Sequence, residues 1–339
     1  MLCLKKKYLL SIALLFSTNA FSITNGQPVA NSSYQSFIHS QYCSGTIIGG
    51  KWVLTAAHCS TETNAEKPVI SSSNNQRTIV SQQINYNDWN NNGTAIDAAL
   101  WLLPHNIAIN KITIITPSPV ESGQNVTIFG YGGTGNQLNK ATHYIIARAD
   151  FPATETVSLD RYNQGNTVGG DSGAPYLNNN NHLVAIHKGH QSDLSIGTKV
   201  SAFKDFILDT INGWNYPTSL NNINGSQIIT VQSLHNDVIQ DQATTTGDVN
   251  IDFNQSTCSN NLISPYDICT YVITSNGHSG TLNLSPTESI IINQPDTEET
   301  TKPDNNDKNK PVITKDKEGG GGVGIFILTL LTMGAFKRR

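Results

Sequence analysis

The sequence predicts an all-β protein of short strands joined by polar loops. Two observations carry this prediction: long runs with helical periodicity are scarce, and Asn, Ser, Thr and Gly are abundant. The 339 residues are enough for two domains with sizeable cores. The formal net charge of -4, with 14% charged residues, gives no reason to expect a nucleic-acid or acidic-substrate partner.

The start of the chain is typical of a secretory signal peptide covering residues 1–22. Lys5–Lys7 form a basic start, Tyr8–Phe16 form an apolar run too short for a comfortable membrane span, and small residues follow where a signal peptidase reads the chain. Cleavage after residue 22 would make Ile23 the first residue, whereas a cut two residues earlier would leave Phe21 first. Without a further role, Ile23 would simply begin an edge strand.

Five cysteines are present, and Cys3 lies in the export segment. The other four form two local pairs, Cys43 with Cys59 and Cys258 with Cys269, which fits two disulfides made in an oxidising compartment. Buried free thiols are the alternative.

The first strand pair ends at a histidine. Two apolar runs flank a Gly-Gly turn in residues 43–59, and the second run ends at His58. A bridge between Cys43 and Cys59 would fix the position of His58. A histidine beside a cysteine is also a possible metal ligand, but no second Cys/His cluster stands at ligand spacing, so we expect no metal site.

Asp97 stands directly ahead of an apolar run that ends at Leu103. A carboxylate in this place is at least partly buried, and burial without a hydrogen-bond donor is costly. A histidine N–H is a suitable donor. The alternative is that Asp97 only caps the strand from a turn.

The segment Gly169–Pro175 sets Ser172 between glycines. Glycines let a tight turn expose the hydroxyl and aim backbone N–H groups at one spot beside it, which suits acyl transfer. Gly-Asp-Ser-Gly strings also occur in ordinary turns, so this motif needs the other two to indicate chemistry.

His58, Asp97 and Ser172 follow one another in the chain order of the chymotrypsin triad. Residues 23 to 214 therefore resemble a trypsin/chymotrypsin-type serine protease. The motifs that match are Thr55–Cys59, Ile96–Leu100 and Gly170–Pro175. This resemblance implies a double six-stranded β-barrel with the site between the barrels, a protein or peptide substrate, and no metal or organic cofactor.

The resemblance also implies a role for each matching residue. Ser172 is the expected nucleophile, His58 the general base and then acid, and Asp97 the group that orients the imidazole. The backbone N–H groups of Gly170 and Ser172 would form the oxyanion hole.

The family's activation pair has counterparts here as well. The free amine of Ile23 would pair with Asp171, the residue before the nucleophile. Signal cleavage would then expose the activating amine directly, with no propeptide or at most two further residues to remove.

The specificity pocket departs from the trypsin-like pattern. The position six residues before Ser172 is an acid in trypsin-like relatives and Asn166 here, so a Lys/Arg preference loses its main electrostatic reason. Thr167 and His187 stand at a spacing that resembles the glutamyl endopeptidases, in which a hydroxyl and a histidine grip the substrate carboxylate. A broad preference for small or apolar residues stays open.

The rest of the chain divides into further segments. Residues 198–214 carry apolar side chains at near-helical spacing and resemble the family's C-terminal helix, which completes a protease domain over residues 23–216. Four strand-like runs in residues 217–293, separated by turn residues, predict a small β-sandwich of immunoglobulin-like type. Cys258 and Cys269 would staple one of its loops.

The C-terminal part predicts a linker and a sorting tail. Residues 294–318 are polar, mixed in charge and contain three prolines, as in disordered linkers. Residues 319–339 run from four glycines through a short apolar stretch to a basic end, and they resemble the GlyGly-CTERM tail of Gram-negative secreted proteins. This resemblance implies the export machinery and a rhomboid-like sorting protease as partners, and transient membrane contact. A plain C-terminal anchor is the alternative.

The sequence thus predicts an exported serine endopeptidase, secreted or held at the surface of a Gram-negative bacterium. The alternative is a surface-displayed binding protein in which an inactive protease fold carries the β-sandwich. The complete set of His58, Asp97 and Ser172 favours the enzyme.

Overall fold

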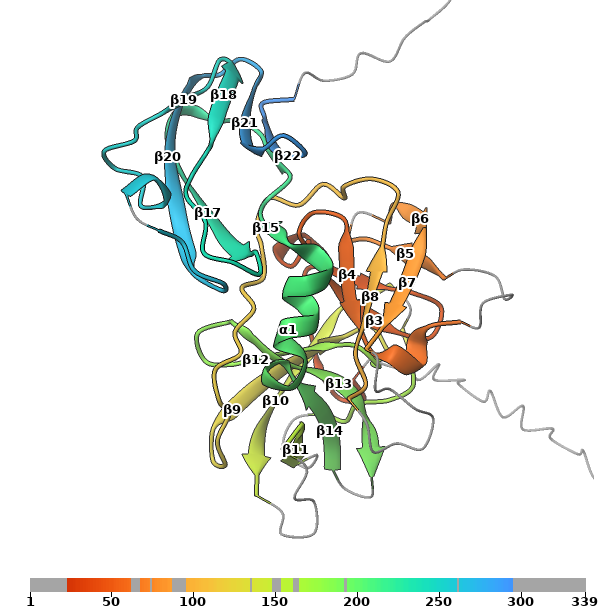
Figure 1. Cartoon of the computed structure of the whole chain (residues 1–339). Coiled ribbons are helices and arrows are strands. Elements are labelled where there is room, and N and C mark those ends of the chain that lie inside the picture. Colours follow the sequence, from red (N-terminus) through yellow and green to blue (C-terminus); the bar gives the residue numbers. More distant parts are fainter. Residues whose placement is uncertain are drawn as a thin grey trace, which may run out of the picture. The chain divides into compact units, whose positions relative to one another are not determined.

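The computed structural model describes residues 23–61, 68–73, 75–86, 96–134, 136–147, 154–160, 165–191, 194–260 and 262–294. The expected signal peptide, nearly all of the linker and the sorting tail lie outside these residues. Within them the chain is built mainly of strands, as predicted (Figure 1). None of the helices in the described part is long and apolar enough to cross a membrane.

The first sheet has seven antiparallel strands in the order β6-β5-β2-β3-β4-β8-β7. Its turn between β3 and β4 is the expected Gly-Gly turn, with positive φ at both Gly49 and Gly50. Between β6 and β7, Val80 donates to Pro68 on one side and Ser81 to Leu102 on the other, so one bent segment joins the two ends of the sheet. The strands are β2 (Phe37–His39), β3 (Ser44–Ile48), β4 (Trp52–Thr55), β5 (Val69–Ser71), β6 (Arg77–Ile79), β7 (Gln82–Asn85) and β8 (Ala99–Leu102).

The second sheet closes into a six-stranded barrel because β9 pairs with β10 as well as with β12. Strand β1 is added at the edge through β10. The barrel encloses a core that includes Ile128, Tyr176 and, from the N-terminal segment, Ile23. The strands are β1 (Gln27–Pro28), β9 (Asn125–Gly130), β10 (Asn139–Ile146), β11 (Thr156–Asp160), β12 (Pro175–Leu177), β13 (Leu183–Gln191) and β14 (Leu194–Lys199). The two sheets together confirm the chymotrypsin-type fold.

Helix α1 (Val200–Ile211) follows the second barrel, where the near-helical spacing predicts it (Figure 1). Its buried face carries Val200, Phe203 and Ile207, which pack in one cluster with residues of both sheets. Asn212 ends the helix in the left-handed conformation, and its N–H closes the last turn on the carbonyl of Leu208. The helix is shorter than the predicted segment because the chain already enters a strand at residue 213.

The chain continues into two four-stranded sheets, ordered β15-β17-β20-β19 and β16-β22-β21-β18. Their core contains Val231, Tyr271 and Leu282 and fits the predicted sandwich. The first strand begins at Gly213, four residues before residue 217, where the sequence predicts the start of the second domain. The domain boundary itself stays a prediction. The strands are β15 (Gly213–Asn215), β16 (Ser219–Leu220), β17 (Asn224–Leu234), β18 (Thr244–Gly247), β19 (Asn250–Ile251), β20 (Ile268–Asn276), β21 (Gly280–Ser285) and β22 (Glu288–Ile292).

Buried amides of these last strands satisfy the backbone of the segment that leads from β8 to β9. Gln232 on β17 accepts from the N–H of Ile115 at 3.0 Å and donates to its carbonyl at 2.6 Å. Asn215 on β15 donates to the carbonyl of Thr113 at 2.9 Å. Both amides are fully buried, so they replace ladder partners that this irregular segment lacks.

Candidate active site

His58 and Asp97 meet because of how two strands pair. Strands β4 and β8 run antiparallel with Thr55 opposite Ala99. His58 comes three residues after Thr55, in a single 3-10 turn (Ala57–Cys59), and Asp97 comes two residues before Ala99. The pairing therefore carries both side chains to the same end of the sheet.

Both oxygens of the Asp97 carboxylate are bound by the same residue. Oδ2 lies 2.7 Å from Nδ1 of His58, and Oδ1 accepts the backbone N–H of His58 at 3.0 Å. Asp97 is 2% exposed, whereas the His58 side chain is 38% exposed. A buried carboxylate held in this way fixes the ring through Nδ1 and leaves the solvent-facing nitrogen to handle protons.

The serine turn packs directly on the end of β4. The backbone N–H of Ser44 donates to the carbonyl of Ser172 at 2.7 Å. Gly173 has a φ of +80°, and a side chain there would begin 2.1 Å from Oγ1 of Thr55 and 3.0 Å from the backbone N of Ala56. Only glycine allows this approach, which sets Ser172 beside the turn that carries His58.

Within the described residues no hydrogen bond joins Ser172 to His58, and the Ser172 hydroxyl makes none. The roles expected for them, nucleophile and general base, require such a bond during the reaction. The bond between Asp97 and His58 is present in full. Bonds between nucleophile and base commonly tighten only when substrate fills the site.

Two backbone N–H groups beside the hydroxyl are open. Among the described residues, those of Gly170 and Ser172 have no acceptor within hydrogen-bond distance. Their neighbours are used: the N–H of Asp171 donates to Val168 at 3.1 Å, and the N–H of Gly173 donates to His187 at 2.8 Å. The open pair is the arrangement needed to bind an oxygen that becomes negative.

The predicted partners Ile23 and Asp171 are in contact and fully buried. The Asp171 carboxylate accepts the backbone N–H groups of Gly132 at 2.8 Å, Val168 at 2.9 Å and Ile23. Burial raises the pKa of Asp171 to about 6, and the three N–H groups oppose that rise. Because Ile23 enters this site through its backbone nitrogen, the residue does more than begin a strand.

The residues expected in the specificity pocket lie on segments that adjoin the serine turn. Thr167 is fully buried, with its hydroxyl 2.8 Å from that of Ser195. His187 is 2% exposed, with Nδ1 2.7 Å from the hydroxyl of Tyr176. Asn166 pairs through its backbone with Thr24, at 2.8 and 2.9 Å, and within the described part its buried Oδ1 has no partner.

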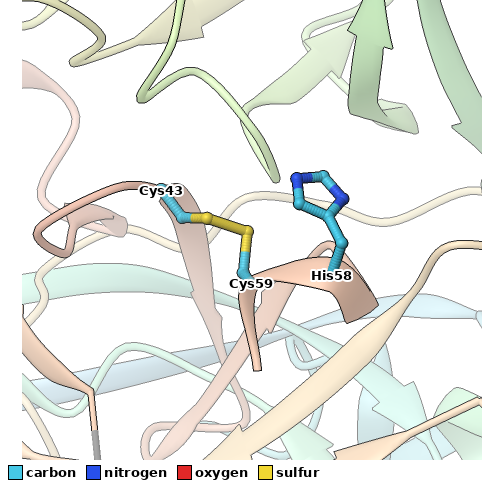
Figure 2. Close-up of side chains that lie close together, drawn as sticks. All are labelled: Cys43, His58 and Cys59. Atoms are coloured by element: carbon cyan, nitrogen blue, oxygen red, sulfur yellow. A yellow bond between two sulfur atoms is a disulfide. The ribbon is translucent and has the colours of Figure 1, made fainter. Parts of the chain in front are cut away.

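Both expected disulfides are formed, Cys43 with Cys59 and Cys258 with Cys269. Figure 2 shows the first of them next to the ring of His58. The two sulfurs and a ring nitrogen lie within 4.8 Å of one another, a grouping that resembles a metal site. Sulfurs joined in a disulfide cannot act as thiolate ligands. Because Cys59 directly follows His58, the disulfide instead restrains the turn that carries His58.

Three polar residues that contact the site are not indicated by the sequence. Tyr176 and Ser195 bind the residues expected in the pocket, and Ser44 binds the serine turn. Each lies in an apolar strand pattern, where nothing marks a polar side chain as facing a site. Only Ser44 carries a local signal, since it follows Cys43 of the bracketed hairpin.

Comparison with known proteins places these residues in a family context. Residues 23–207 match the family model described as Trypsin. The chain is 28% identical over 209 residues to an "Uncharacterized peptidase" of Corynebacterium glutamicum (strain R), which covers 59% of this chain and 69% of the relative. It is 35% identical over 117 residues to a protein named "Trypsin" from Simulium vittatum, covering 32% of this chain and 46% of the relative.

Two solved structures are also similar. The VesB protease of Vibrio cholerae aligns with a TM-score of 0.48 and 17% identity, covering 80% of this chain and 99% of its own. The secreted serine protease VesC from Vibrio cholerae aligns with a TM-score of 0.47 and 16% identity, covering 79% of this chain and 71% of its own.

Proposed function

From the premise that this chain belongs to the trypsin family of serine proteases, we propose that it is an exported endopeptidase whose nucleophile is Ser172. One observation carries the proposal. The buried carboxylate of Asp97 binds His58 through both oxygens. The nearby serine turn has two backbone N–H groups, those of Gly170 and Ser172, that are open to donate to a substrate oxygen.

In the proposed reaction His58 takes the proton of the Ser172 hydroxyl as Oγ attacks the scissile carbonyl carbon. The carbonyl oxygen becomes negative and accepts the N–H groups of Gly170 and Ser172. His58 then gives its proton to the leaving amine, and the acyl group stays on Ser172. Water, deprotonated by His58, releases the acyl group in the same way. Asp97 orients the imidazole and stabilises the imidazolium.

We place the mature N-terminus at Ile23. In the uncut chain the buried Ile23 has a φ of +43°, a conformation that is costly for a β-branched residue. The φ torsion exists only while a residue precedes it, so cleavage removes that strain. Cleavage also turns an amide N–H beside Asp171 into an ammonium. Both effects favour the cut chain.

We further propose that the primary pocket is formed by Asn166, Thr167 and His187. A neutral amide in place of an acid disfavours Lys and Arg. Thr167 and His187 are buried and fixed by hydrogen bonds, so they are ordered donors for an acceptor side chain such as Glu. A small or apolar residue is the competing preference, and a peptide library profiled at each cleavage position decides between them.

Export and sorting complete the proposal. Two disulfides are typical of proteins that mature outside the cytosol. The signal-like segment 1–22 supports the proposal that the chain is cleaved on export. The glycine-rich tail 319–339 supports the proposals that the chain contacts the membrane transiently and that a rhomboid-like protease removes the tail. Mass spectrometry of the exported product reports both termini.

The decisive test of the function is labelling with a serine-directed phosphonate. The correctly cut wild-type chain is expected to take one label, and Ser172→Ala none. A wild-type chain that begins at Ile23, is folded and takes no label would instead support the alternative, an inactive protease fold that displays a binding surface.

A further inference from the structure

Ser44 sits between the two donors of the proposed oxyanion hole. It lies on β3, directly after Cys43, and is 2% exposed. Its hydroxyl donates to the carbonyl of Gly170 at 2.9 Å and accepts the N–H of Tyr131 at 3.2 Å. Its own backbone N–H donates to the carbonyl of Ser172 at 2.7 Å. One residue therefore holds both Gly170 and Ser172.

The turn at Gly170 is also held by Asp171, whose N–H donates to the carbonyl of Val168 at 3.1 Å and whose carboxylate accepts the N–H of Val168 at 2.9 Å, but one of its sides is open. Gly170 has a φ of +103°, and no atom lies within 4 Å of the place where a side chain on Gly169 would begin. On the other side, the backbone of Gly132 lies 2.7 Å from the corresponding position on Gly170. A rotation about Gly170 toward the open side would meet no steric barrier at Gly169, and it would move the N–H of Gly170 away from the oxygen that it must bind.

We propose that Ser44 is a positioning residue for the oxyanion hole, an inference that rests on the proposed protease function. Its hydroxyl fixes the carbonyl of Gly170, and its N–H fixes the carbonyl of Ser172, so the two open N–H groups keep their spacing and direction. A preorganised donor pair stabilises a developing charge without reorganising during the reaction. Loss of the Ser44 hydroxyl should therefore affect the transition state more than the bound substrate.

The matched control is Thr218, which lies between β15 and β16. Its buried hydroxyl is used as that of Ser44 is: it donates to the carbonyl of Ile107 at 2.6 Å and accepts the N–H of Ile109 at 2.9 Å. Thr218→Val removes both bonds and keeps the volume, but it leaves the bonds to Gly170 and Ser172 intact. Both variants lose one hydroxyl, so a purely structural role would lower their melting temperatures and activities alike.

The experiment measures kcat and KM on a peptide amide, and affinity for a peptide boronate that mimics the tetrahedral intermediate, in the full chain cut at Ile23. Removing an oxyanion donor outright costs about 100-fold to 1,000-fold in kcat. Because Ser44 only positions the donor, Ser44→Ala is expected to lower kcat by about 10-fold or more, with KM within about 3-fold. Boronate affinity should fall in parallel with kcat.

Thr218→Val is expected to stay within about 3-fold of wild type in both measurements. The inference is overturned if Ser44→Ala keeps wild-type kcat, or if Thr218→Val loses as much. Should Ser44→Ala not fold, Ser44→Gly removes the same hydroxyl and carries the same expectation. A wild-type chain that neither hydrolyses peptides nor takes the phosphonate overturns the proposed function itself, which distinguishes the two failures.

Discussion

The backbone nitrogen of Ile23 lies within hydrogen-bond distance of the buried carboxylate of Asp171. In the uncut chain this nitrogen is an amide, so the carboxylate has three N–H partners and no positive charge. Burial then raises the pKa of Asp171 from 3.8 to about 6. A difference of that size corresponds to on the order of 3 kcal/mol between the protonated and ionised forms.

This contact predicts that the benefit of N-terminal cleavage depends on pH. Because the folded pKa is raised, the uncut chain has its full stability below pH 3.8 and loses it as the pH rises through about 6. In the cut chain the ammonium of Ile23 neutralises the ionised carboxylate. The melting temperature of the chain that begins at Ile23 should therefore exceed that of the chain that retains residues 21–22, by more at pH 7.5 than at pH 4.5.

Asp171→Asn is the control, because it removes the charge from both forms and should remove the pH dependence of the difference. An equal gap at the two pH values in the wild-type pair would contradict the ion pair. The measurement is thermal unfolding of all four proteins at both pH values.

A second prediction concerns Asp97, which binds both the ring and the backbone of His58. Asp97→Asn keeps the shape but can donate where an acceptor is needed, so the imidazole takes the wrong tautomer. By the chymotrypsin precedent, kcat should fall by about four orders of magnitude. The measurement is kcat and KM on a peptide amide, with the melting temperature as a check of folding.

The exposed Asp205 on helix α1, which forms an ion pair with Lys204, gives the matched control. Asp205→Asn should leave kcat unchanged. Loss of less than about 10-fold in Asp97→Asn, with the protein folded, would argue that Asp97 is a strand-capping residue after all.

The sequence alone leads to the fold and to the residues of the proposed triad for identifiable reasons. His58 and Ser172 stand where an apolar strand meets a cysteine or glycines, and Asp97 is a carboxylate directly ahead of an apolar run, so each marks a change from core to site. The barrels follow from strand patterns and from the resemblance that those motifs carry. Ile23 is predicted by its place behind the expected signal peptide.

Contacts between strands that are distant in the chain cannot be predicted from such sequence motifs. Nothing near Ser44 indicates that its hydroxyl meets Gly170, which is 126 residues away. Tyr176 reads as an ordinary core residue until β12 and β13 pair and set its hydroxyl on His187. The bond expected between His58 and Ser172 is also not formed among the described residues, because a sequence motif does not determine how a side chain is rotated.

A third prediction concerns the contact between Tyr176 and His187. The Tyr176 hydroxyl is buried, and its hydrogen-bond partner in the described part of the chain is Nδ1 of His187. Burial raises the pKa of Tyr176 well above its usual range, so it remains a phenol. The bond to this buried phenol fixes the ring of His187 in the proposed pocket.

Tyr176→Phe removes this bond and releases the ring, so the ratio of Glu to Gln cleavage on matched peptides should fall several-fold. The exposed Tyr144 supplies the control variant Tyr144→Phe, which should match wild type. A Tyr176→Phe ratio equal to that of wild type would show that Tyr176 does not position His187 for the substrate side chain.

The last prediction concerns Gln232, whose amide replaces the ladder partner of Ile115. Gln232→Met keeps the length of the side chain but removes both hydrogen bonds to Ile115, which leaves its buried N–H and carbonyl unsatisfied, and it also removes the bonds to the amide of Asn215 and the carbonyl of Tyr266. Each such group costs about 1–3 kcal/mol, so the free energy of unfolding should fall by roughly 2 kcal/mol or more. Urea unfolding, followed by tryptophan fluorescence, measures the change.

Gln227 lies on the same strand β17 but is exposed, so Gln227→Met is the matched control and should shift the urea midpoint little. The segment that Gln232 holds leads into β9 of the proposed protease, so Gln232→Met should also inactivate the enzyme at a lower temperature. If the two variants unfold alike, the amide of Gln232 does not stabilise that segment. If only Gln232→Met is destabilised, the strands after residue 213 stabilise the proposed protease and are more than a separate appendage.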